Sequence, residues 1–186
     1  GATDIKQIVL VDNQLTRTFF GTNQVAAVAV PPPVTAEKFL IQQRVAVAGG
    51  SVGGVGPIIR VTPFDEWGRR IFSMNTVKGQ VDIVQGITEI TPTYAKVEAI
   101  QGKGNFVWTM RIATSSIPRA TLSKFLYHEI DPKNSDQRLK IVRLYLQSER
   151  IADARAELEQ LIKDFPELDR LKDQGKTLQQ MSAQRI

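Results

Sequence analysis

The stretch from Gly79 to Ile112, GQVDIVQGITEITPTYAKVEAIQGKGNFVWTMRI, decides the fold of this chain. Its segments are short, rich in β-branched and aromatic residues, and separated by turn-forming residues such as Thr91-Pro92. After that turn, the small apolar residues Ala95, Val97 and Ala99 alternate with polar ones, which is the period of a half-buried strand. The stretch therefore predicts three antiparallel strands joined by turns, with Trp108 on the core face of the last one.

The same pattern extends towards the N-terminus. Further strands are expected at Ile5–Val11, Leu15–Phe20, Gln24–Val30, Pro57–Thr62 and Arg69–Asn75. Residues 36–45 fit either a buried strand or a short helix, and a bend or bulge is expected at Gly86. Residues 1–117 are thus predicted to form a mainly antiparallel β domain, either a barrel or a sandwich. The part from Gly86 to Ile117-Pro118 resembles a small SH3- or Sm-like barrel.

After Pro118 the apolar period becomes helical. A short helix is expected at Thr121–Tyr127, and Asn134 or Ser135 is placed to cap the next one. Two amphipathic helices and a weaker third one, Leu168–Met181, then follow. The expected fold class is α+β, in which a helical region at 119–186 follows the β domain.

Residues 135–168 resemble a single tetratricopeptide repeat and span that family's period of about 34 residues. Tyr145 matches the aromatic position of the first helix, Ala154 the small residue where the helices cross, and Pro166 the closing proline. The chain departs from the family at several other positions: Arg138, Val142, Glu149, Leu158 and Leu161. The resemblance implies an antiparallel helix pair and the binding of a protein or peptide.

The composition narrows the possible chemistry. The chain has no cysteine and a single histidine, which excludes disulfides, cysteine-ligated metals and sites built from several histidines. No apolar run approaches the roughly 20 residues of a membrane-spanning helix. The formal net charge of +5 is spread along the chain, and Arg69-Arg70 is its one basic pair. Nucleic acid is therefore not the expected partner, because its binding proteins concentrate basic residues in a stripe.

Two local motifs contain residues that are common in phosphate-binding or metal sites. The loop Gly49–Gly56 lacks the lysine and the following helix of a phosphate-binding loop, so it is expected to be a flexible hairpin loop. His128-Glu129-Ile130-Asp131 lacks a second histidine, and His128 is expected to lie at the boundary between the β and helical parts. We therefore expect no catalytic residue, no cofactor site and no metal site. The candidate interaction surface comprises Trp67, Arg69, Arg70 and Arg138.

The function expected from these observations is a non-enzymatic protein–protein interaction or scaffolding module. A nucleic-acid-binding β-barrel and a glycan-recognition accessory domain using Trp67 are the alternatives. The absence of an initiator methionine suggests an excerpt of a larger bacterial protein, and the composition leans towards the periplasm, envelope or exterior. The sequence does not specify the oligomeric state.

Overall fold

The computed structural model describes residues 9–13, 16–20, 35–49, 56–100, 106–168 and 171–176. The chain divides into two compact units, Gly1–Thr35 and Ala36–Ile186. In the first unit, β1 (Val9–Asn13) and β2 (Thr16–Phe20) pair as an antiparallel hairpin. The strand expected at Gln24–Val30 lies outside the described residues.

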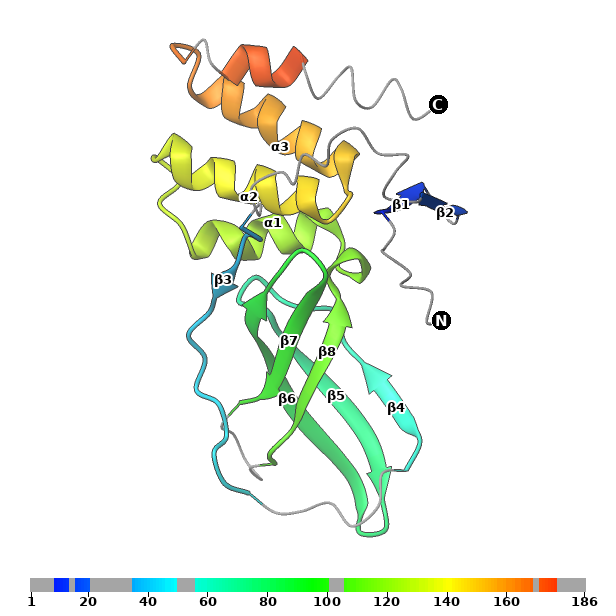
Figure 1. Ribbon diagram of the computed structural model, residues 1–186. Coiled ribbons are helices and arrows are strands. Elements are labelled where there is room, and N and C mark those ends of the chain that lie inside the picture. The colour runs from blue at the N-terminus through cyan, green and yellow to red at the C-terminus, as the bar shows by residue number, and fades with distance from the viewer. Residues whose placement is uncertain are drawn as a thin grey trace, which may run out of the picture. The chain divides into compact units, whose positions relative to one another are not determined.

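The second unit is built on a curled antiparallel sheet, a half-barrel, with helices at one end (Figure 1). Five strands follow one another in the order β4-β5-β6-β7-β8. Their bounds are β4 (Ile58–Val61), β5 (Arg69–Thr76), β6 (Gly79–Ile90), β7 (Tyr94–Ala99) and β8 (Thr109–Ala113). The predicted meander and the α+β class are confirmed. The sequence left a barrel and a sandwich as alternatives. The structure is nearer a barrel, because these strands form one curled sheet and not two sheets that face each other. The path through this sheet begins at β4 and ends at β8.

The ambiguous segment 36–45 is extended rather than helical. Its two-residue strand β3 (Phe39–Leu40) pairs with β6 at Ile90 and Glu89, beyond the point where β5 ends its own pairing with β6. The chain then crosses to the end of β7, where Val45 bridges to Ile100. The apolar residues of this segment therefore fill a gap that the shorter β5 leaves.

The bend expected at Gly86 lies elsewhere. Gly86 pairs in register with Arg69 on one side and Glu98 on the other, and the register shift in β6 falls between Ile87 and Glu89. The physical reason for glycine is close packing: a Cβ at position 86 would lie 3.1 Å from the Cδ atom of Gln43. Gly86 therefore makes room for a crossing segment rather than for a bulge.

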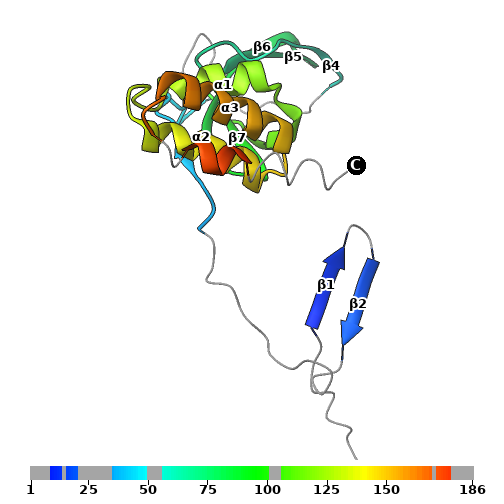
Figure 2. The same cartoon turned by 90° about the horizontal axis from the view of Figure 1, so that it is seen from above.

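The helices are α1 (Arg119–His128), α2 (Ser135–Gln147) and α3 (Ile151–Asp164), and α1 is longer than the sequence indicated. Asn134 caps α2 as predicted, because its side chain accepts hydrogen bonds from the backbone N–H groups of Asp136 and Gln137. A further helical turn covers residues 171–176. Figure 2, which looks down on this end of the sheet, shows α1, α2 and α3 packed over it. Among the residues described, no helix has the length and apolar character needed to cross a membrane.

One large apolar cluster joins the sheet to all three helices. It includes Ile87 and Val97 from the sheet, Phe125 from α1 and Leu144 from α2, all nearly inaccessible to solvent. A smaller cluster lies farther down the same inner face of the sheet and contains Phe72, Met74, Ile83 and Ala99. Trp108 packs against that cluster, 5.7 Å from Phe72 between ring centroids, as expected for a core residue. The sheet and helices are thus stabilised by a shared core.

The turn between α2 and α3 has a specific geometry. Glu149 adopts a left-handed φ of 59°, and its N–H donates to the Leu146 carbonyl at 3.0 Å. The N–H of Arg150 donates to the Tyr145 carbonyl at 2.9 Å. These two bonds form a Schellman motif, in which glycine is the favoured residue at the left-handed position. Glu149 thus stands at the left-handed position of the turn that joins α2 to α3, where glycine is the usual residue.

Candidate interaction surfaces

The loop before β5 places Trp67 at the junction of the sheet and α1. The Asp65 carboxylate accepts hydrogen bonds from the backbone N–H groups of Trp67 (2.9 Å) and Arg69 (2.8 Å), which closes a tight turn. The Trp67 ring stacks on His128 with centroids 4.3 Å apart, and 51% of Trp67 stays exposed. His128 therefore lies at the boundary between the sheet and the helices, as the sequence indicated. One face of Trp67 is occupied by this stack.

The turn is also held against α1 by packing and charge. Gly68 has a φ of +69°, and a Cβ there would lie 2.6 Å from the Phe125 ring. On the same side, Lys124 forms an ion pair with Glu66 at 2.9 Å, which lowers the pKa of the Glu66 carboxyl. Glycine at position 68 thus serves both the left-handed turn and the close approach to the helix.

The basic pair Arg69-Arg70 is divided between the two faces of the sheet. Successive residues of a strand point to opposite faces, so Arg69 shares the outer face with Gly86, and Arg70 shares the inner face with Gln85. Arg70 is half-buried: its Nε donates to the Gln85 carboxamide at 2.8 Å, and its guanidinium lies 4.6 Å from the centroid of the Phe64 ring. The pair therefore does not form one basic stripe.

Arg138, the fourth residue expected at the surface, is buried. Its guanidinium forms an ion pair with Asp164 of α3 and donates to the Tyr127 hydroxyl of α1 at 3.3 Å. The Asp164 partner acts to raise the pKa of Arg138, and Arg138 in turn lowers that of Asp164. Arg138 thus connects three helices, and of the four candidates only Trp67 and Arg69 are largely exposed.

The edge strand β4 is an exposed surface that the sequence did not reveal. Ile58, Ile59 and Val61 are 60%, 47% and 41% exposed. On one side β4 pairs with β5; its other side has no partner strand among the described residues. Nothing in IIRV distinguishes an edge strand from a buried one, because exposure depends on which strand lies beside it.

A buried polar network around Glu157 was also missed. Glu157 is 3% exposed, and its carboxylate accepts hydrogen bonds from Ser123 (2.5 Å) and Tyr127 (2.7 Å) and pairs with Arg119 at 3.0 Å. Burial and Glu157 together raise the pKa of Tyr127 to about 12. The helical period could have indicated this site, because Glu157 lies three residues after the buried Ala154 and therefore on the same buried face of α3. The network links α1 to α3.

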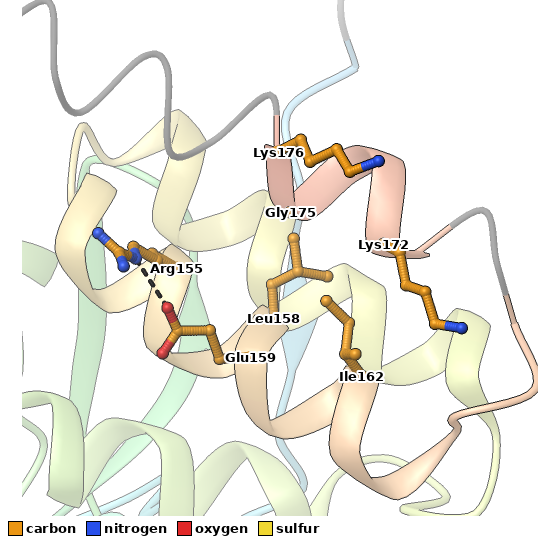
Figure 3. A pocket seen from close by; sticks show the side chains of 7 residues that line it. All are labelled: Arg155, Leu158, Glu159, Ile162, Lys172, Gly175 and Lys176. Atoms are coloured by element: carbon orange, nitrogen blue, oxygen red, sulfur yellow. Dashed lines mark hydrogen bonds and ion pairs between the residues drawn. The ribbon is translucent and has the colours of Figure 1, made fainter.

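A small apolar pocket lies between α3 and the turn at 171–176 (Figure 3). Leu158 and Ile162 point from α3 towards Gly175, while Arg155 is paired with Glu159 beside them. Its volume of about 170 Å³ is below the roughly 300–1,000 Å³ of typical small-molecule sites. This pocket is therefore a packing feature of the helices and not our candidate site.

Residues 50–55 of the loop Gly49–Gly56 lie outside the described residues. In the part of the chain that is described, no group of three or more His, Asp or Glu side chains could hold a metal ion. No protein-family model, no curated protein and no solved structure matches the chain. The tetratricopeptide and SH3- or Sm-like resemblances remain predictions.

Proposed function

We propose that this chain is a non-enzymatic protein-interaction module that receives an extended peptide as an added strand along β4. The observation that carries this proposal is the outer edge of β4, which has exposed apolar side chains and, within the described part of the chain, pairs with no strand other than β5. Addition of a strand to such an edge is a common mode of peptide recognition, in which backbone hydrogen bonds supply affinity.

The backbone geometry of β4 supports Val61 as the residue that would form hydrogen bonds with an added strand. Thr62 N–H donates to the Ile71 carbonyl at 3.0 Å, and Val61 is the preceding residue, opposite Phe72. Hydrogen bonding alternates along an antiparallel strand, so the N–H and C=O of Val61 point away from β5. These two groups are available to a strand that docks on the open side.

The side chains of β4 support an apolar peptide. Ile58 is paired with Met74 and Val61 with Phe72, so both project on the inner face that carries the smaller apolar cluster. Alternate side chains of an added strand would extend this cluster. The bulge in β4 and the charge of Arg60 disfavour pairing of this edge with the edge strands of other molecules. They therefore favour a defined peptide partner over aggregation.

A displayed library of random 12-residue peptides, selected against the full chain, tests the proposal. We expect peptides with alternating apolar residues, whose affinity is measured by fluorescence anisotropy. Val61→Pro removes the outward N–H without removing a bond to β5 and should weaken binding at least tenfold. Val77→Lys, at the exposed β5–β6 turn and five positions along the chain from Phe72, the partner of Val61, is the control and should bind normally. Failure to select any peptide, or equal binding by Val61→Pro, would contradict the proposal.

A further inference from the structure

The outer face of the sheet carries a pocket of about 380 Å³, which is within the range of small-molecule sites. Its walls come from the crossing segment 42–44, from β5 and from the end of β7, and they consist of Gln42, Gln43, Arg44, Arg69 and Ile100. Two of these residues are cations, two are carboxamides and none is acidic. The pocket is separate from the β4 edge and from the helical network.

Within the residues that the structure describes, neither Arg44 nor Arg69 forms an ion pair with a carboxylate. Glu98, which is paired with Gly86 on the same face, is already engaged by Thr88 at 2.5 Å and by Lys96 at 3.0 Å. Among the described residues that line it, the pocket therefore carries two positive charges and no negative one.

One of the two arginines is held in place before any ligand binds. The Nε of Arg69 donates to the side-chain oxygen of Gln43 at 3.1 Å, and the Gln43 amide donates to the Trp67 carbonyl at 2.9 Å. Gln43 itself can lie on the sheet because position 86 has no side chain. With Nε occupied, the terminal nitrogens of Arg69 are left to bind an oxyanion. Such preorganisation reduces the entropy lost on binding.

We infer that this pocket binds the phosphate group of a small phosphate monoester. A guanidinium presents its N–H donors in a planar fork that matches phosphate and carboxylate oxygens. The charge of the ligand distinguishes the two: a phosphate monoester carries about −1.5 to −2 at neutral pH and matches both arginines, whereas a carboxylate carries −1. Ile100 supplies an apolar wall for the organic part of the ligand. The inference does not depend on the proposed peptide site.

Isothermal titration calorimetry of the full chain with phenyl phosphate, inorganic phosphate and acetate tests this assignment. We expect phenyl phosphate to bind most tightly, inorganic phosphate more weakly, and acetate at least tenfold more weakly than phosphate. Arg69→Gln and Arg44→Gln should each weaken phenyl phosphate binding at least tenfold. Lys78→Gln removes the same charge at the β5–β6 turn, and its affinity should change less than twofold.

A third variant tests whether the close packing over position 86 shapes the pocket. In Gly86→Ala the added Cβ would lie 3.0 Å from Cγ2 of Ile100 and 3.1 Å from Cδ of Gln43, so it shifts both lining residues without altering any charge. We expect this variant to weaken phenyl phosphate binding while the far-ultraviolet circular dichroism spectrum stays unchanged. Three results would overturn the inference: no phosphate binding at 20 mM ligand, binding of acetate as tight as phosphate, or equal losses in Arg69→Gln and Lys78→Gln. Binding of the selected peptide by Arg69→Gln should stay normal, which separates this site from the β4 edge.

Discussion

Replacement of Glu157 by alanine tests how the helices are held together. The change removes a carboxylate that is 3% exposed and accepts from Ser123 and Tyr127 while pairing with Arg119. Removing one partner of a buried, hydrogen-bonded charge pair costs about 3–5 kcal/mol of unfolding free energy. The Arg119 side chain is 38% exposed, so water can solvate it once the carboxylate is gone. The expected loss therefore lies at the lower end, about 3 kcal/mol.

Urea denaturation of the full chain, followed by circular dichroism at 222 nm, measures this loss. Glu157→Gln keeps the shape and one acceptor oxygen, so its loss should be intermediate. Glu159→Ala, two residues on, breaks an exposed pair with Arg155 at 2.7 Å and should change the unfolding free energy by less than about 0.5 kcal/mol. If Glu157→Ala lost less than about 1 kcal/mol, or no more than Glu159→Ala, the network would not contribute to holding the helices.

Three further changes give defined outcomes. Glu149→Gly should raise the unfolding free energy by about 0.5–1 kcal/mol in urea denaturation, since the left-handed φ of 59° strains a side chain; a loss would contradict the assigned strain. Ala154→Leu, at a fully buried position, should cost about 1–3 kcal/mol, while Ala156→Leu should be nearly neutral in the same assay; equal losses would show that the helices pack by another face. Burial raises the pKa of Tyr127 and of Tyr145 to about 12, so the folded chain keeps protons that the unfolded chain releases near pH 10. Stability should therefore fall as the pH rises from 10 to 12, as thermal melts at stepped pH would show, and an unchanged melting temperature would refute the shifts.

Local patterns predicted the strands and helices whose burial follows a simple period. In β7 the alternation of Ala95, Val97 and Ala99 places all three in the core. Asn134 was recognised as a cap because its side chain has the right length and position to accept from the first turn of α2. These features depend on neighbours within a few residues, which the sequence displays directly.

Features that depend on distant segments could not be predicted in this way. The sequence predicted a bend at Gly86. The need for glycine there comes instead from Gln43, which packs over this position and lies more than forty positions away in the chain. Arg69 and Arg70 looked like one basic patch, yet the two-residue period of a strand separates them. Arg138 looked like a surface cation because its partner Asp164 belongs to the next helix. The exposure of β4 similarly follows from the order of strands and not from its own residues.

Hydrogen exchange at the Val61 amide tests the proposed strand addition most directly. This N–H points to the open side of the sheet, so it should exchange quickly in the free chain. With a saturating amount of the selected peptide, nuclear magnetic resonance should show exchange at Val61 slowed at least tenfold, with Thr62, already bonded to Ile71, much less affected. Unchanged exchange at Val61 while the peptide protects amides elsewhere would contradict strand addition at β4.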